Sequence, residues 1–382
     1  QQKDLTAALT QAKALDKRLD EGGARIIELA RIAEANRDYG TAFKCYDYVI
    51  GLGRNDANHF QARTGAVHAR FLQLTDPAPD APEPTLAELA DLDQRMAATL
   101  SEMGMGKHTL NLLRERARLN AYHLNRPQEA IALLEEGLAL AGIDAKAKAE
   151  LKLDLGDIHV LGGDIWEASL LFSQVDLDFK HDPLGHEARL RNAKVSFYAG
   201  DFLWAQAQLQ VLKQSTSKLI ANDAMELSLR ITDALGVDSN ATPLSYFARA
   251  ELLRAQRLYD RALLTLDSLT QEFPMHTLGD DVLYERYRIA FARKRFAEAA
   301  TFLEKVIELW PNDILVDNAL IDLGRLYEEK LKDPEKAMAC YEKLLFQQPG
   351  SIFVPEARQR YRRLRGDAPD APEQKKPPLQ HP

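Results

Sequence analysis

The sequence predicts an all-α solenoid of antiparallel helix hairpins without a β-sheet, and one recurring pattern carries this prediction. Seven alanines are each followed four residues later by Tyr, Leu or Phe, and in six copies Val or Leu follows three residues after that. Successive alanines are 88, 38, 37, 57, 37 and 38 residues apart. A unit of about 37 residues therefore recurs, which is typical of solenoid proteins. The anchor alanines are Ala42, Ala130, Ala168, Ala205, Ala262, Ala299 and Ala337.

The bulk composition narrows the class of protein. The 382 residues are 46% hydrophobic and 28% charged, and no apolar run approaches the roughly 18 residues that would indicate a transmembrane helix. A net charge of −8 opposes nonspecific attraction to nucleic acid, so nucleic acid is not expected as a partner. Cys45 and Cys340 each follow an anchor alanine by three residues. Their repeats are too far apart for a disulfide, and we expect two unpaired core residues.

The N-terminal part of the chain contains a first irregularity. Residues 1–21 predict a single helix, the remainder of a partial repeat, that stops at Gly22 and Gly23. A repeat array is then expected over residues 24–214. The spacing of 88 indicates a degenerate hairpin over residues 55–103 whose two helices are separated by a proline-rich loop at 75–85, because proline forbids helix in this context.

A second irregularity falls at residues 215–242. About 20 residues of helical pattern there belong to no copy of the motif, which explains the spacing of 57. This segment is predicted to be an extra helix and a junction, and the sequence leaves open whether residues 217–236 act as a hinge.

The remaining chain predicts C-terminal repeats and a capping helix over residues 243–365. Pro274, Pro311 and Pro349 each stand twelve residues after an anchor alanine, where proline ends the second helix of a hairpin. Residues 366–382 are polar and proline-rich, and a disordered tail is expected.

A second small residue precedes most anchors by twelve positions, and it is expected where helix backbones approach one another. In the last repeat this residue lies one position further from the anchor, because the turn contains one inserted residue. The set comprises Ala30, Gly156, Ala193, Ala250 and Gly324.

Taken together, these patterns resemble the tetratricopeptide repeat (TPR) family. The segments GDFLWAQAQLQVL, LYDRALLTLDSLTQEFP and RFAEAATFLEKVIELWP are close to the family pattern, and the resemblance covers residues 24–350. It implies a TPR-type α-solenoid, a right-handed superhelix of antiparallel hairpins. The loop segments FPMHTLGDDVLYERYRIA and WPNDILVDNALIDLGRLY are similar to those of periplasmic TPR proteins of Gram-negative cell envelopes.

The resemblance also implies where a partner would bind. In TPR proteins the first helices of successive hairpins line a concave groove that holds a peptide or a helix of a partner. Acidic residues such as Asp157, Glu251 and Glu285 share these positions with basic and aromatic residues, which are the types that dominate interface hot spots. The alternative is that the aromatic residues pack between helices and the charges form a solvated face. The candidate partner-binding residues are Arg116, Tyr122, Arg191, Lys194, Phe197, Tyr198, Phe247, Arg254, Tyr284, Arg288, Phe291 and Arg325.

No catalytic signature accompanies these features. The chain has no phosphate-binding glycine loop, no nucleophile elbow and no HExxH or Cys-x-x-Cys pair. We therefore expect no enzymatic activity, no catalytic residues, no cofactor and no metal site.

The leading functional hypothesis is a non-enzymatic scaffold or adaptor that holds a protein partner in its groove and assists assembly of a bacterial cell-envelope complex. The alternative is a cytosolic regulatory TPR protein that binds a signalling peptide. The chain begins QQKDL without a methionine, so we expect a processed form or a piece of a longer protein. A periplasmic location is favoured over a cytoplasmic one, with membrane association through a partner or a lipid anchor preceding Gln1. The partner and the stoichiometry are not predicted.

Overall fold

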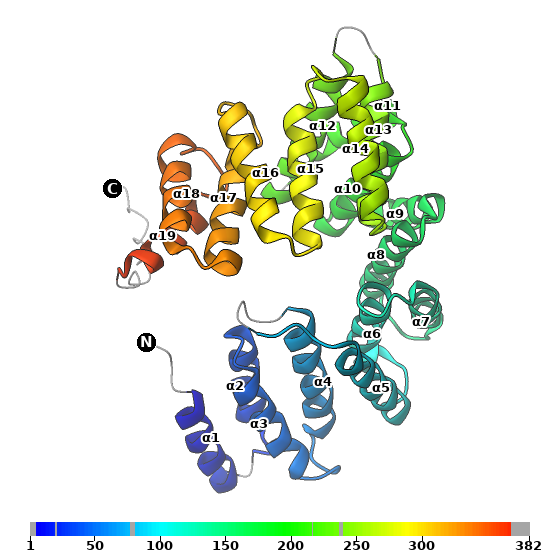
Figure 1. Ribbon diagram of the computed structural model, residues 1–382. Coiled ribbons are helices and arrows are strands. Elements are labelled where there is room, and N and C mark those ends of the chain that lie inside the picture. Colours follow the sequence, from blue (N-terminus) through cyan, green and yellow to red (C-terminus); the bar gives the residue numbers. More distant parts are fainter. Residues whose placement is uncertain (1–4, 20, 77–80, 216, 237–239, 368–382) are drawn as a thin grey trace, which may run out of the picture. The chain divides into compact units, whose positions relative to one another are not determined.

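The computed structural model describes residues 5–19, 21–76, 81–215, 217–236 and 240–367. Within these ranges the chain forms nineteen α-helices and no β-strand (Figure 1). Consecutive helices pack as antiparallel pairs joined by short turns, and the all-α hairpin solenoid is confirmed. The right-handed sense of the superhelix stays a prediction.

The chain divides into two compact units, residues 1–221 and residues 222–382, which we call the N-terminal unit and the C-terminal unit. The boundary lies inside the segment 215–242 that belongs to no repeat. The N-terminal unit contains α1 (Leu5–Leu19), α2 (Ala24–Ala35), α3 (Tyr39–Gly51), α4 (His59–Thr75), α5 (Leu86–Met103), a 3₁₀ turn η1 (Lys107–Thr109), α6 (Leu110–Tyr122), α7 (Pro127–Ala139), α8 (Ala145–Gly162), α9 (Ile165–Asp178), α10 (Pro183–Tyr198) and α11 (Phe202–Leu212).

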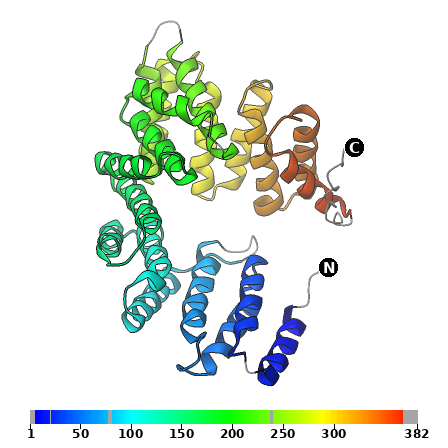
Figure 2. The ribbon, with the colours of Figure 1, turned by 180° about the vertical axis from the view of Figure 1, so that it is seen from behind.

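The C-terminal unit holds most of the extra helix and three complete hairpins. Its hairpins follow one another in chain order, from green through yellow to orange (Figures 1 and 2). Its helices are α12 (Lys218–Leu235), which begins just before the boundary, α13 (Thr242–Ala255), α14 (Tyr259–Glu272), α15 (Gly279–Ala292), α16 (Phe296–Leu309), α17 (Val316–Leu326), a π-helical turn η2 (Tyr327–Leu331), α18 (Pro334–Gln347) and α19 (Val354–Arg365).

The recurring motif marks the core of each hairpin. All seven anchor alanines are 0% exposed, and the residues four positions later are at most 2% exposed. The anchors lie at the start of the second helices, where a larger side chain would separate the two helices of the hairpin. The alanines therefore recur in the sequence because the helix backbones come close together once in every hairpin.

Glycine replaces alanine where an aromatic ring comes closest. A Cβ atom on Gly156 would lie 2.4 Å from the ring of Phe172, and one on Gly324 would lie 2.4 Å from the ring of Tyr341. Both aromatic residues stand four positions after their anchors. Glycine and aromatic residue thus form one packing unit across each of these hairpins.

Every hairpin turn has a left-handed residue five positions before its anchor. Two of these residues are glycines, one is asparagine, which tolerates this conformation, and four are arginine or lysine, for which positive φ is unfavourable. The set is Arg37 (φ 57), Asn125 (φ 55), Gly163 (φ 94), Gly200 (φ 82), Arg257 (φ 60), Lys294 (φ 61) and Lys332 (φ 56).

The inserted residue of the last hairpin is absorbed by the π-helical turn Tyr327–Leu331 at the end of α17. A π-helical turn accommodates one additional residue in a helix while the rest of the helix keeps its register. Gly324 therefore still meets Tyr341, although it lies one position further from its anchor.

Other expectations have mixed outcomes. Cys45 and Cys340 are free and buried, as predicted. Helices α4 and α5 form the expected degenerate hairpin, whereas residues 77–80 of its proline-rich loop and 368–382 of the predicted disordered tail lie outside the described residues. Among the described helices, none combines the length and the apolar character that crossing a membrane requires.

Candidate functional site

The N-terminal unit has a groove of about 410 Å³ lined by the first helices α2, α4 and α6. Gly65 on α4 helps to form it, because the ring of Tyr46 lies 2.5 Å from where a Cβ atom of residue 65 would stand. The hydroxyl group of Tyr46 donates to Glu34 on α2 at 2.9 Å. The ring of Tyr46 thus forms an aromatic wall of the groove.

Uncharged polar groups face the same groove. The side chains of Gln61 on α4 and Asn111 on α6 are exposed. Their amide groups have no hydrogen-bond partner within the part of the chain that the structure describes. An amide side chain offers both a donor and an acceptor, so the two residues match the alternating N–H and C=O groups of an extended peptide.

Titratable groups lie between these amides. His68 Nδ1 is 2.6 Å from Glu115 Oε1, and this hydrogen bond raises the pKa of His68 above its usual value. Burial raises the pKa of Glu34 despite its hydrogen bond from Tyr46. The groove therefore contains two titratable groups whose pKa values are raised by their surroundings.

The partner-binding residues that the TPR resemblance implied did not include Gln61, Asn111 or His68. Helix α4, which carries Gln61 and His68, belongs to the degenerate hairpin without an anchor alanine, so the family pattern offers no position on it. Asn111 lies at the start of α6, before the positions that the family pattern indicates. The polar stretch around Gly65 in HFQARTGAVHARF was the only sequence signal available.

The five predicted arginines all lie on first helices, but each already binds a carboxylate of a neighbouring helix. A partner carboxylate would have to displace an existing ion pair at each position. The pairs are Arg116 with Asp93 (2.7 Å), Arg191 with Asp157 (2.8 Å), Arg254 with Glu285, Arg288 with Glu251 (3.4 Å) and Arg325 with Glu356 (2.9 Å).

Three predicted aromatic residues are buried, which corrects the expectation that they face a partner. Phe197 and Phe247 are 0% and 1% exposed, and Tyr284 is 5% exposed. Tyr284 donates its hydroxyl to Asp322 at 2.7 Å, and its ring lies under the guanidinium of Arg288 at 4.7 Å. For these residues packing between helices is the better interpretation.

The other predicted residues remain accessible. Lys194 is exposed, Phe291 is 40% exposed, and Tyr122 and Tyr198 are partly buried. Binding of a partner by this subset stays a prediction.

A side chain of the extra helix α12 contacts the buried Phe247. The Arg230 guanidinium of α12 lies 5.4 Å from the centre of the Phe247 ring on α13 and binds Asp281 on α15 at 2.6 Å. The first helices α13 and α15 are therefore partly occupied by a helix of the same chain.

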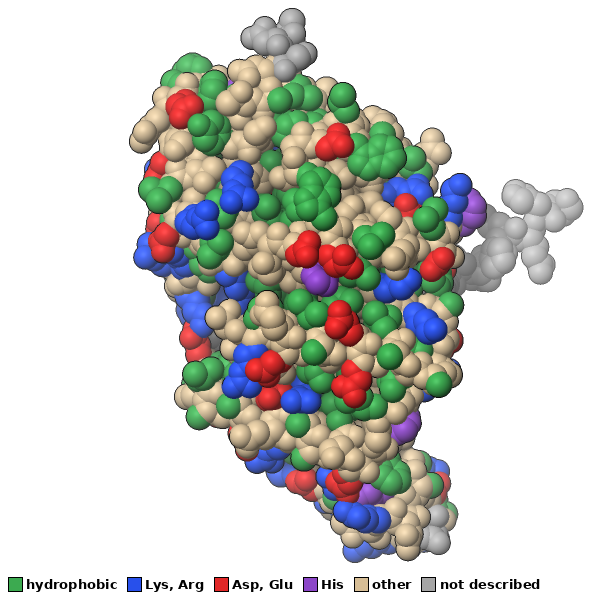
Figure 3. Space-filling model, turned by 90° about the vertical axis from the view of Figure 1, so that its right-hand side faces the viewer, with side chains coloured by type: hydrophobic (Ala, Val, Ile, Leu, Met, Phe, Trp, Pro, Cys, Tyr) green, Lys and Arg blue, Asp and Glu red, His purple; other side chains and the backbone are tan. Residues whose placement is uncertain are grey.

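Large apolar side chains are exposed on second helices, and the sequence analysis did not select them. Trp166 on α9 is 72% exposed and Trp204 on α11 is 56% exposed, and both helices pack against α10. The face turned to the viewer in Figure 3 has hydrophobic side chains scattered among acidic and basic ones.

Within the described ranges, no group of three or more His, Cys, Asp or Glu residues is placed to hold a metal ion. Burial raises the pKa of Cys45 to about 11 and that of Cys340 to about 12. Both thiols are therefore protonated at neutral pH, and neither has the properties of a reactive cysteine.

Comparison with known proteins supports the repeat assignment. Residues 317–345, which span most of α17 to α18, match the family model described as tetratricopeptide repeat. The recognition of TPR repeats is therefore confirmed. The similarity of the loops to envelope proteins stays a prediction, and no curated protein sequence matches the chain.

Solved structures with a similar fold have low sequence identity. A tetratricopeptide repeat protein from Parabacteroides merdae is 14% identical, with 78% of this chain and 97% of that chain covered and a TM-score of 0.42. The apo form of RapI is 10% identical, with 90% and 97% covered and a TM-score of 0.41. A Rap protein complexed with Competence and Sporulation Factor is 12% identical, with 91% and 94% covered and a TM-score of 0.37. These values carry no argument about function.

Proposed function

We propose that the protein is a non-enzymatic scaffold that holds an extended segment of a protein partner in the groove between α2, α4 and α6. The observation that carries this proposal is the pair of exposed amide groups on Gln61 and Asn111, which have no partner within the described ranges. Exposed polar groups can bind a peptide backbone without first breaking an internal bond, whereas the paired arginines cannot.

The groove also has the size that this role needs. Its volume of about 410 Å³ falls in the range of roughly 300–1,000 Å³ that is usual for ligand pockets. The wall formed by Tyr46 and Gly65 supplies apolar contact beside the amides. Such a combination favours a peptide over a purely ionic ligand.

Site-specific photo-crosslinking tests the proposal. A photoreactive amino acid at position 61 or 111, in the cells that make the protein, is expected to form adducts with a partner. The matched control is Asp47, an exposed residue on the second helix α3. Adducts at position 47 without adducts at 61 or 111 would refute the groove as the binding site.

The finer part of the proposal is that the partner belongs to a bacterial cell-envelope complex, and its support is the loop similarity of the C-terminal repeats. Fractionation of cells that express the natural gene with a C-terminal tag tests the compartment. Recovery in the cytosolic fraction alone would favour the alternative, a cytosolic regulatory TPR protein that binds a signalling peptide.

A further inference from the structure

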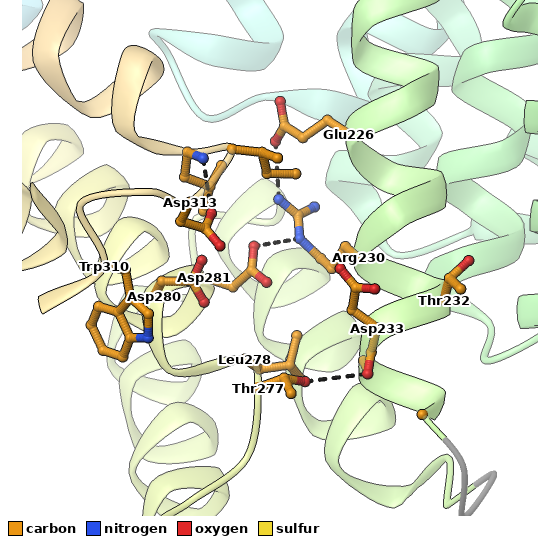
Figure 4. A pocket seen from close by; sticks show the side chains of 14 residues that line it. Glu226, Arg230, Thr232, Asp233, Thr277, Leu278, Asp280, Asp281, Trp310 and Asp313 are labelled. Carbon is orange, nitrogen blue, oxygen red and sulfur yellow. Dashed lines mark hydrogen bonds and ion pairs between the residues drawn. The ribbon is translucent and has the colours of Figure 1, made fainter. Parts of the chain in front are cut away.

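The C-terminal unit contains a second cavity, of about 610 Å³. It lies where the end of α12 meets the turns that precede α15 and α17 (Figure 4). None of the candidate residues from the sequence lines it. Its charged lining consists of Glu226, Asp233, Asp280, Asp281, Asp313 and Arg230.

Internal pairing uses only part of this charge. Arg230 binds Asp281 at 2.6 Å and Glu226 at 3.0 Å. Asp233, Asp280 and Asp313 form no ion pair within the described residues. Three of the five carboxyl groups that line the cavity are therefore not paired with a cationic side chain among the described residues.

Asp280 is the most buried of the carboxyl groups that line the cavity. Its side chain is buried, with 5% exposure. Its carboxyl group faces those of Asp281 and Asp313 (Figure 4). Burial and these two like charges raise the pKa of Asp280 to about 7. A buried carboxyl group is unfavourable when ionised, and a hydrogen bond between the side chains of Asp280 and Asp313 also raises the pKa of Asp280.

An aromatic wall stands beside these carboxyl groups. The indole ring of Trp310 lines the cavity, and it can lie close to the start of α15 because residue 279 is glycine. A Cβ atom there would be 2.9 Å from the ring. Tryptophan is the aromatic side chain that attracts cations most strongly, so the wall and the carboxyl groups favour the same kind of ligand.

We propose that this cavity binds a lysine or arginine side chain carried by a segment of a partner protein, with Asp280 and Asp313 as counter-ions and Trp310 as the aromatic wall. The proposal rests on the proposed scaffold function and assigns a second, basic recognition element to the partner. Five carboxylates and one guanidinium line the cavity, and this charge complements a cationic segment. The volume of about 610 Å³ falls in the usual range for ligand pockets and leaves room for backbone beside the side chain.

The test uses the full chain and a fluorescent octapeptide of alternating lysine and glycine, with binding followed by fluorescence anisotropy in ~150 mM salt to reduce nonspecific attraction. Asp313→Asn keeps the acceptor for the backbone N–H of Leu315, which Asp313 Oδ1 binds at 2.9 Å. Loss of this charge is expected to weaken peptide binding about tenfold, the effect of one charge-assisted hydrogen bond.

Two further variants separate the cavity from the overall charge. Trp310→Leu keeps the net charge and is expected to weaken binding about fivefold through loss of the cation–π contact. Glu342→Gln removes one charge from an exposed position on α18 and is expected to leave binding unchanged. Equal effects of Asp313→Asn and Glu342→Gln, or unchanged binding by Trp310→Leu, would show that only nonspecific attraction operates.

Proton release provides an independent readout. A bound cation lowers the pKa of Asp280, so peptide binding near pH 7 should release a proton and strengthen as pH rises from about 6 to 8. Asp281 and Asp313 are the charged groups that act on Asp280, and the other charged groups that line the cavity are Arg230, Glu226 and Asp233.

Calorimetry in buffers of different ionisation enthalpy measures this release. Asp280→Asn is expected to abolish it, and binding by the unaltered chain without proton release would contradict the role of Asp280. Crosslinking at positions 61 and 111 reports on the other groove, so failure of the peptide test and failure of the scaffold proposal are distinguishable.

Discussion

The first helices of the two units share one packing motif but present different surfaces. In the N-terminal unit, α2, α4 and α6 line an open groove with amide groups that have no partner within the described ranges. In the C-terminal unit, α13 and α15 are joined by ion pairs and partly covered by α12. The packing motif thus determines how closely the helix backbones approach. It does not determine whether the outer face of a first helix lines a groove or forms ion pairs with a neighbouring helix.

The difference has an electrostatic origin. Glu285 on α15 is 0% exposed and binds both Arg254 on α13 and Arg288 on its own helix. In the N-terminal groove, the His68 and Glu115 side chains are 40% and 15% exposed. The ion pairs between α13 and α15 are therefore structural, whereas the His68–Glu115 pair of the groove remains in contact with solvent.

The largest expected effect follows from breaking the ion pairs that join α13 and α15. Glu285→Gln leaves two partly buried guanidinium groups without their shared carboxylate, and we expect a loss of about 3 kcal/mol in the free energy of unfolding. Glu115→Gln in the groove should cost less than about 1 kcal/mol because its partner is largely solvated. Urea unfolding measures both, and equal losses would contradict the distinction between the two faces.

A smaller difference is expected for the glycines that meet aromatic rings. Gly324→Ala places a methyl group 2.4 Å from the ring of Tyr341, which is 0% exposed, and we expect a loss of about 2 kcal/mol from overpacking. Gly65→Ala meets Tyr46 at 2.5 Å, but that ring borders an open groove and can shift, so about 1 kcal/mol is expected. Thermal unfolding measures the pair, and a costlier Gly65→Ala would show that the groove wall is rigid.

The turns are a feature that the two units share. Gly200 has φ +82, and nothing lies within 4 Å of where its Cβ would be, so Gly200→Ala tests backbone strain alone and should cost about 1 kcal/mol. Gly51 in α3 also has open space around it but no positive φ. Gly51→Ala is expected to be neutral or stabilising, and an equal loss in both variants would rule out strain as the cause.

The smallest expected effect concerns pH. The pKa of His68 is raised in the folded protein by its hydrogen bond to Glu115. A raised histidine pKa stabilises the fold fully below the unfolded value of about 6.5, and this stabilisation is lost as pH rises through the folded value. We expect the free energy of unfolding to fall by about a few tenths of a kcal/mol as the pH rises from 6 to 8. The Tm should therefore be lower at pH 8 than at pH 6. Glu115→Gln should remove this dependence, and an unchanged pH profile in that variant would assign it to another group.

The sequence predicted the fold in detail and the binding surface only in part. The buried alanines recur at regular intervals along most of the chain, so their pattern can be recognised from the sequence alone. Of the left-handed residues five positions before the anchors, only Gly163 and Gly200 could be predicted from the sequence. The arginine, lysine and asparagine residues at the other turns do not by themselves indicate a positive φ. Ion pairs such as Arg191 with Asp157 join residues 34 positions apart, and a family pattern does not say which of two facing charges will meet.

By itself, the sequence determined that this chain is a stack of helix hairpins and which small residues allow the helices to approach. Tertiary structure alone decided which first-helix side chains remain available to a partner. The physical reason is that backbone packing follows local periodicity, whereas exposure and charge pairing depend on which distant residues face one another. Helix α12 illustrates this, because it belongs to no repeat and yet its Arg230 contacts Phe247, a predicted binding residue that is 1% exposed.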